Sequence, residues 1–80
     1  MQLPFALTKY TITMAVMKVI EVLSESKTSW EDATARGVKR ASKSVDGIRS
    51  AYINEQSVVV DGKGKVTAYR VNLKITFEVK

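Results

Sequence analysis

The feature that most constrains the fold of this chain is its last stretch, residues 65–80, which reads KVTAYRVNLKITFEVK. Polar and apolar residues alternate through it, so that Val71, Leu73 and Ile75 fall on one face of an extended chain and Asn72 falls on the other. This period of two predicts a β-strand. At ~3.3 Å per residue the strand would be roughly 45 Å long. The apolar face of this strand must be buried against other residues, and a chain of only 80 residues offers few of them.

Three more elements precede this strand. They follow in the order strand, helix, strand, at residues 15–23, 30–45 and 48–60. An Asp-Gly pair at 46–47 is expected to end the helix, and Asp-Gly-Lys-Gly at 61–64 predicts a hairpin turn. The order β-α-β-β therefore predicts an α+β fold, with a three-stranded antiparallel sheet and one helix.

The residues of the predicted helix indicate how it would lie on the sheet. Ser29 is expected to act as the N-cap and to accept a hydrogen bond from the backbone N–H of Asp32. Small residues recur along the apolar stripe at Ala33, Gly37 and Ala41, which predicts a close approach to the sheet. On helix propensity alone, alanine at position 37 would stabilise the helix, whereas leucine would overpack the contact.

The lengths of these elements predict self-association. A helix of 16 residues is ~25 Å long at ~1.5 Å per residue, so it covers only about half of the long strand. A chain of this size also buries only about 60–65% of the surface that it exposes when unfolded. Disulfides are excluded as a support because the chain has no cysteine. We therefore expect the remaining apolar surface to meet other copies of the chain.

The residue types leave little room for catalysis. The absence of histidine and cysteine removes the usual neutral-pH general base, thiolate metal sites and every His-dependent triad. Glu21, Glu55 and Glu78 are expected to be solvated or to form interface ion pairs, and Asp61 belongs to the turn but could contribute to a cation site. Trp30 is expected to be a hydrophobic anchor. We predict that the protein is not an enzyme.

The formal net charge of +5 raises the question of a nucleic-acid partner. Arg36, Lys39, Arg40 and Lys43 form a basic patch on the predicted helix, but positive charge in this half also suits the helix dipole. No exposed aromatic platform accompanies the patch, and no nucleic-acid-binding module matches. We expect no nucleic-acid partner.

The chain has no segment that approaches the ~20 apolar residues of a membrane span, so no membrane association is expected. Residues 1–13 lack a charged region before an apolar core and make a poor signal peptide. The absence of cysteine fits a reducing compartment, and the expected location is the cytoplasm. We expect residues 1–13 to be an N-terminal extension and residues 14–80 to be the domain.

Four segments together resemble the dodecin family of small β-α-β-β proteins. They are KVIEVLSES at 18–26, SWEDATARGVKRASKSVDGIR at 29–49, INEQ at 53–56 and YRVNLKITFEV at 69–79. The resemblance implies a sheet partly wrapped around one helix and a hollow homododecamer, in which trimeric and dimeric contacts bury the rest of the sheet. It also implies a small-molecule ligand, commonly a flavin.

The resemblance extends to the positions of the flavin-binding residues but not to their side chains. In typical flavin-binding members a tryptophan follows an Ile-Arg-like pair at the start of the second strand and stacks on the ring. The matching position here is Ser50, after the Ile-Arg pair at 48–49. A glutamine that hydrogen-bonds the ring follows the tyrosine of the third strand, and the matching position after Tyr69 is Arg70. Serine has no aromatic face, and arginine has no acceptor.

The family resemblance leads us to predict a dodecin-like binding or storage protein for FMN or riboflavin, with Ser50 and Arg70 in the cofactor pocket. The alternative is a dodecin-like cage that has lost flavin and binds calcium or other cations. The residues that would bind a metal are not identified by the sequence.

Overall fold

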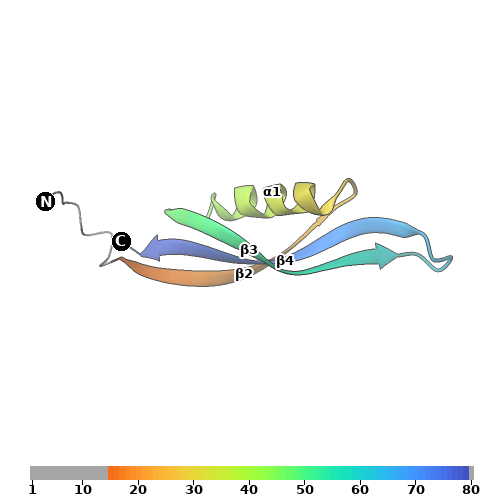
Figure 1. Ribbon diagram of the computed structural model, residues 1–80. Helices are drawn as coiled ribbons and strands as arrows, with labels where there is room; N and C mark the ends of the chain where they lie inside the picture. Colours follow the sequence, from red (N-terminus) through yellow and green to blue (C-terminus); the bar gives the residue numbers. More distant parts are fainter. Residues whose placement is uncertain (1–14, 80) are drawn as a thin grey trace, which may run out of the picture.

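The structure is a computed structural model and describes residues 15–79. Its elements in chain order are β2 (Val16–Ser26), α1 (Trp30–Ala41), β3 (Ile48–Val60) and β4 (Val66–Val79). The strands form one antiparallel sheet in the order β2-β4-β3, and α1 lies against one face of it (Figure 1). The predicted β-α-β-β fold is confirmed. The predicted extension at residues 1–13, and Met14 after it, lie outside the described residues.

Strand β2 is longer than predicted, because the segment Ser24–Ser26 continues the strand instead of opening the loop. Its pairing with β4 holds as far as Ser26, which lies opposite Tyr69. The Ser26 hydroxyl donates to Asp32 Oδ2 at 2.5 Å and accepts from the backbone N–H of Thr28 at 2.9 Å. These two bonds satisfy a serine that is buried where β2 passes beneath the start of α1.

Helix α1 begins as predicted and ends earlier. The Ser29 hydroxyl accepts from the backbone N–H of Asp32 at 2.9 Å, which confirms the predicted N-cap. The regular helix stops at Ala41 rather than near residue 45, because the turn at 42–44 contains tighter bonds to carbonyls three residues earlier. Gly47, with φ of 76°, then redirects the chain into β3 in a conformation that favours glycine.

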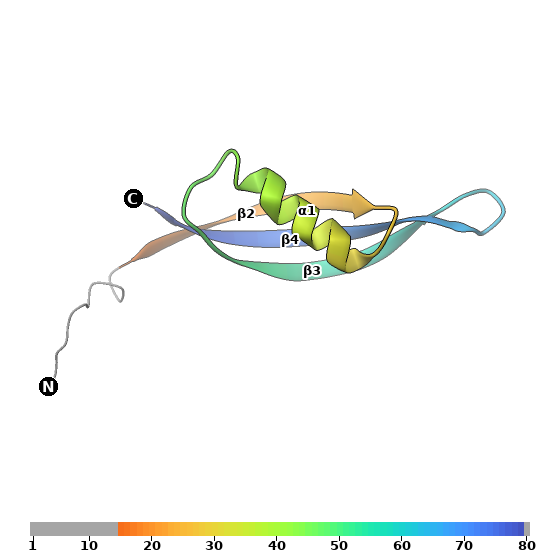
Figure 2. The same cartoon turned by 90° about the horizontal axis from the view of Figure 1, so that it is seen from above.

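The core lies between α1 and the middle of β4. Val71, Leu73 and Ile75 have no exposed surface, and neither has Ala33 of α1. The alternation predicted for the last strand is therefore confirmed: its odd-numbered apolar positions in the middle of β4 face the helix. Figure 2 shows α1 lying obliquely across all three strands.

The small stripe of α1 brings the helix very close to the sheet. A Cβ added at Gly37 would lie 2.8 Å from Cδ1 of Leu73 and 3.1 Å from Cβ of Ser24. This confirms the predicted close approach, and a methyl group at this position would require Leu73 or Ser24 to shift. The expectation that alanine at position 37 would stabilise the protein considered helix propensity alone and neglected this contact.

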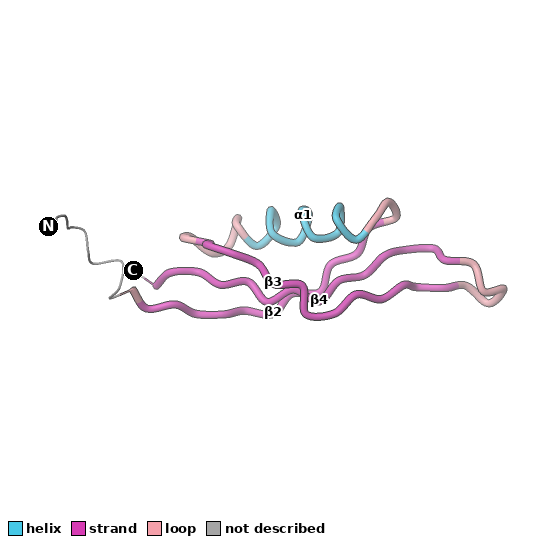
Figure 3. The backbone as a smooth tube through the Cα atoms, in the orientation of Figure 1, coloured by secondary structure: helices cyan, strands magenta, loops and turns pink. Residues whose placement is uncertain are grey.

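The helix covers only the middle of the sheet. It has 12 residues, or ~18 Å at ~1.5 Å per residue, whereas β4 has 14 residues, or ~46 Å at ~3.3 Å per residue. The sheet extends beyond α1 at both ends, and the β3–β4 hairpin projects past the start of the helix (Figures 1 and 3). All exposed large hydrophobic residues of the described chain lie on the strands, at Val16, Met17, Val19, Leu23, Tyr52, Ile53, Val58, Val60, Val66 and Val79.

Candidate functional site

The candidate site lies on the face of the sheet that points away from α1, which we call the open face. Strand register defines its members, because residues directly opposite one another share a face. From β2 through β4 to β3, successive rows are Glu25, Arg70 and Ser57; Leu23, Asn72 and Glu55; Glu21, Lys74 and Tyr52; and Val19, Thr76 and Ser50. The open face thus combines carboxylates, cations and exposed apolar side chains.

Asn72, at the middle of the open face, has an unsatisfied polar atom. Its side-chain oxygen Oδ1 is buried and has no hydrogen-bond partner among residues 15–79. A shallow hollow of about 260 Å³ lies beside it, lined by Glu21, Val22, Leu23 and Asn72. A buried acceptor without a partner costs about 1–3 kcal/mol, so this oxygen calls for a donor or a cation.

The carboxylates around Asn72 are of the kind that a hard cation prefers. Glu55 lies directly opposite Asn72 in β3, and Glu21 lines the same hollow from β2. Both are exposed, and neither forms an ion pair within residues 15–79. Ca²⁺ takes six to eight oxygen ligands from carboxylates, amide carbonyls and water. The side chains of Glu21, Glu55 and Asn72 offer ligands of these types.

One protomer supplies only part of such a site. Within residues 15–79 no group of three or more Asp, Glu, His or Cys residues is close enough to hold a metal ion. Glu21, Glu55 and Asn72 would therefore hold a cation only together with water or with residues of a second copy.

Ser50 and Arg70, the two predicted flavin positions, both lie on the open face but far apart. Ser50 pairs with Thr76 and Arg70 lies six residues earlier on β4, a separation of ~20 Å along the strand. The Arg70 guanidinium is paired with the carboxylate of Glu25, with Nε 2.7 Å from Oε2. Within one protomer Ser50 and Arg70 are therefore too far apart to contact the same flavin ring. Their role in a cofactor pocket stays a prediction that requires two protomers.

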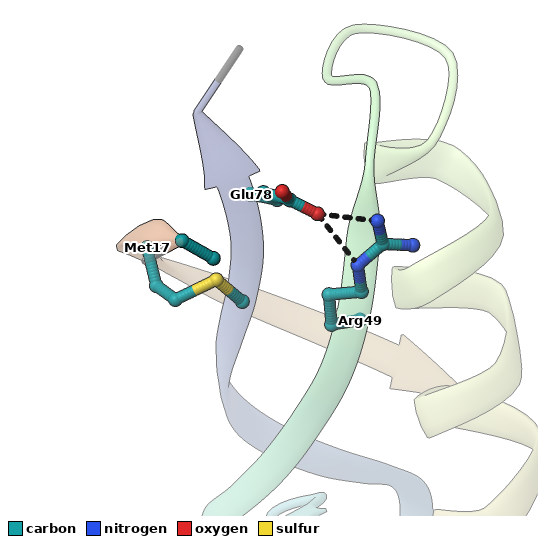
Figure 4. A pocket seen from close by; sticks show the side chains of 4 residues that line it. Met17, Arg49 and Glu78 are labelled. Carbon is teal, nitrogen blue, oxygen red and sulfur yellow. Dashed lines mark hydrogen bonds and ion pairs between the residues drawn. The ribbon is translucent and has the colours of Figure 1, made fainter. Parts of the chain in front are cut away.

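A second hollow lies at the end of the sheet next to Ser50. It has a volume of about 400 Å³ and is lined by Ala15, Met17, Arg49 and Glu78. Arg49 is the extra residue of a β-bulge between Ile48 and Ser50. Figure 4 shows its guanidinium directed at the Glu78 carboxylate, with Nε 3.2 Å from Oε1. Glu78 was expected to be solvated or to form an interface ion pair, and it forms an ion pair within the protomer instead; Arg49 was not singled out by the sequence.

Two other candidates from the sequence have structural roles. The indole of Trp30 meets the Tyr69 ring edge-on, with centroids 5.2 Å apart, and its N–H donates to the Ser57 carbonyl at 2.9 Å, which confirms Trp30 as an anchor. Asp61 Oδ1 accepts from the backbone N–H groups of Lys63 and Lys65, and these bonds lower the pKa of the Asp61 carboxyl. Asp61 therefore stabilises the hairpin turn.

Asn72 was not identified from the sequence as a site residue, although one signal was present. Asparagine is depleted in strands, and Asn72 interrupts the middle of the most regular strand of the chain.

None of the helices in the described part of the chain is both long enough and apolar enough to span a membrane.

Comparison with known proteins decides the family. The family model described as Dodecin matches residues 16–80, which include every element of the fold. The chain belongs to the dodecin family. The resemblance inferred from the four sequence segments is thereby confirmed.

A dodecin from Mycobacterium tuberculosis is similar along most of the chain. That protein is named calcium dodecin and is 48% identical over 67 residues, which span 84% of this chain and 93% of the relative. Its crystal structure, described as that of a calcium-chelating immunodominant antigen with a novel calcium-binding site, matches with a TM-score of 0.71 at 46% identity. The match covers 81% of this chain and 91% of that one.

More distant dodecins share the fold. The dodecin from Streptomyces davaonensis matches with a TM-score of 0.77 at 18% identity and covers 82% of this chain and 96% of that one. A variant of the Thermus thermophilus dodecin matches with a TM-score of 0.76 at 24% identity, covering 82% and 97%.

Proposed function

We propose that this dodecin-family chain forms a homododecameric cage that binds calcium on the open face of its sheet. The observation that carries the proposal is the buried, unsatisfied Oδ1 of Asn72, a residue that lies opposite Glu55 and lines the same hollow as Glu21. The 48% identity to a protein named calcium dodecin supports the same ligand.

The exposed apolar residues of the strands support self-assembly. Leu23 is 68% exposed, Tyr52 65% and Val19 58%, and all three lie on the open face. Such a patch on a lone protomer would be unusual for a soluble monomer. Packing of open faces or strand ends against other copies removes it from water, as the dodecin architecture inferred from the sequence implies.

Assembly would also complete the calcium site. Three side chains of one protomer offer at most five oxygens, two from each carboxylate and one from the amide. A second copy of the open face brought alongside by assembly would double the number of carboxylates near the ion. When bound, Ca²⁺ would neutralise two carboxylates that form no ion pair within residues 15–79, although Lys74 lies opposite Glu21.

Flavin remains the ligand that the family resemblance first suggested, but the residues favour calcium. Serine at position 50 removes the stacking surface, and the arginine at position 70 is occupied by Glu25. The loss of the stacking surface at Ser50 and the pairing of Arg70 with Glu25 both weaken the case for flavin, and neither affects the binding of a cation by the carboxylates.

Calcium titration of the protein and its variants tests the proposal. The double variant Glu21→Gln with Glu55→Gln keeps the shape of both side chains and removes both charges. We expect its affinity for Ca²⁺, measured by calorimetry after dialysis against a chelator, to fall at least about tenfold, a change of ~1.4 kcal/mol.

The control is Glu31→Gln, which removes an exposed carboxylate from the first turn of α1, away from the open face. It should leave the affinity within about twofold of the parent. The mass of each variant in solution, measured in parallel, establishes that the assembly is intact. Failure of the parent to bind Ca²⁺ at millimolar concentration, or equal losses in both variants, would contradict the proposal.

A further inference from the structure

The outward side of α1 carries a second feature that the calcium proposal does not use. Arg36, Lys39 and Arg40 lie on α1, and Lys43 lies in the turn that follows it. The pairs 36/39, 36/40, 39/43 and 40/43 are three or four residues apart, so the four side chains share one side. All four are exposed, and together they line a hollow of about 220 Å³. We call this surface the basic face.

The charges of the basic face are largely uncompensated within the protomer. Arg36 pairs with Asp32 through Nε and Oδ2 at 2.6 Å. For the other three cations, no ion pair occurs within residues 15–79. The only acidic residues of α1 are Glu31 and Asp32, both in its first turn.

The arrangement is unfavourable for the isolated helix. Like charges three or four residues apart repel by about 0.2–0.5 kcal/mol per pair, and the four cations form several such pairs. The helix dipole favours Lys39 and Arg40 in the last turn, and Asp32 pairs with Arg36, so the repulsion among the cations is offset only in part. A multivalent anion in the hollow would convert these repulsions into attractions.

This inference rests on the self-assembly proposed above, which would leave the basic face accessible. All exposed large hydrophobic residues of the described chain lie on the strands and none lies on α1, so the surfaces suited to protein contacts are those of the sheet. Trp30, the aromatic residue of α1, packs against Tyr69 and does not line the hollow. The hollow is thus suited to charge recognition and not to stacking.

We propose that the basic face binds compact anions with two or more linked phosphate groups, such as pyrophosphate or the polyphosphate portion of a nucleotide. The four cations span ~10 Å along the helix axis, at ~1.5 Å per residue, which suits a short phosphate chain. Arg40, which forms no ion pair within residues 15–79, matches phosphate oxygens with paired N–H donors, and Lys39 and Lys43 add mobile point charges. Arg36 bonds Asp32 through Nε, so only its Nη groups are available to the anion.

Calorimetric titration with inorganic pyrophosphate and tripolyphosphate tests this assignment. The full-length protein is used after removal of calcium by a chelator, because calcium itself binds phosphates. We expect orthophosphate to bind at least about tenfold more weakly than pyrophosphate. Raising the salt concentration from about 20 mM to about 200 mM should weaken pyrophosphate binding by a similar factor, because exposed charges are screened.

Matched variants locate the site. Lys39→Gln with Lys43→Gln removes two charges from the basic face, and glutamine keeps a high helix propensity. Lys63→Gln with Lys65→Gln removes two exposed charges from the hairpin turn. The helix variant should lose at least about tenfold in pyrophosphate affinity, and the hairpin variant should stay within about twofold.

Three results would overturn the assignment. Equal losses in both variants, or no pyrophosphate binding at low salt, would leave the cations as a solvated helix surface. The second arm of the test compares ATP and a short DNA duplex with tripolyphosphate. ATP should bind about as well as tripolyphosphate, and a duplex that binds far more tightly would replace the small-anion site with a nucleic-acid surface.

Discussion

Replacement of Gly37 by alanine separates two opposed effects at the contact between helix and sheet. Alanine in a helix interior is favoured over glycine by roughly 1 kcal/mol. The new Cβ, however, would lie 2.8 Å from Cδ1 of Leu73 and 3.1 Å from Cβ of Ser24. Leu73 is completely buried and cannot turn aside freely. Overpacking of this kind costs about 1–3 kcal/mol, so we expect Gly37→Ala to lower the free energy of unfolding by about 1 kcal/mol.

Urea unfolding at a fixed protomer concentration measures this change, since the stability of an oligomer depends on concentration. Ala35→Gly is the matched control, because Ala35 is an exposed position of the same helix. It reports helix propensity alone, and its cost should be roughly 1 kcal/mol. Leu73→Val removes the nearest atom, so alanine at position 37 should be less harmful in that background. The reasoning is refuted if Gly37→Ala stabilises the parent by as much as Ala35→Gly destabilises it.

Two further predictions concern Asp32 and the flavin positions. Hydrogen bonds from Ser26 and Arg36 lower the pKa of the Asp32 carboxyl below its ordinary value of 3.8. The ionised carboxylate therefore stabilises the fold fully above pH 3.8, and this stabilisation is lost as the pH falls through the lowered pKa. Asp32→Asn should therefore lower the melting temperature at pH 7 and have progressively less effect below pH 3.8, and a difference that does not change with pH would contradict this. Ser50→Trp with Arg70→Gln should increase riboflavin affinity at least ~30-fold, as ~2 kcal/mol of restored stacking and burial implies, with quenching of riboflavin fluorescence. No gain in this double variant would mean that the pocket differs at other positions as well.

The elements that could be predicted from the sequence are those specified by local pattern. The alternation of β4 predicted which of its residues face the helix, and the hydroxyl of Ser29 predicted the start of α1. The end of β2 was misplaced because Ser24 and Ser26 resemble loop residues. Ser26 is buried because Asp32 and Thr28, which are brought to it by the fold, satisfy its hydroxyl.

The candidate site could be predicted less well, because it depends on contacts between strands. Asn72 becomes significant only when its oxygen is seen to be buried opposite Glu55, and that pairing follows a β-bulge after Ile53. No local pattern in β3 specifies the bulge. The separation of Ser50 from Arg70 likewise depends on register, which motif matching does not consider.

The central claim is that the part of the sheet that α1 leaves uncovered is buried by other copies of the same chain. Light scattering coupled to size-exclusion chromatography measures the mass of the particle in solution directly. The account predicts a single species of about 107 kDa, twelve times the 8.9 kDa mass of the chain, at micromolar concentration. A monodisperse species of 8.9 kDa would contradict it, because the exposed strand residues would then face water without a partner.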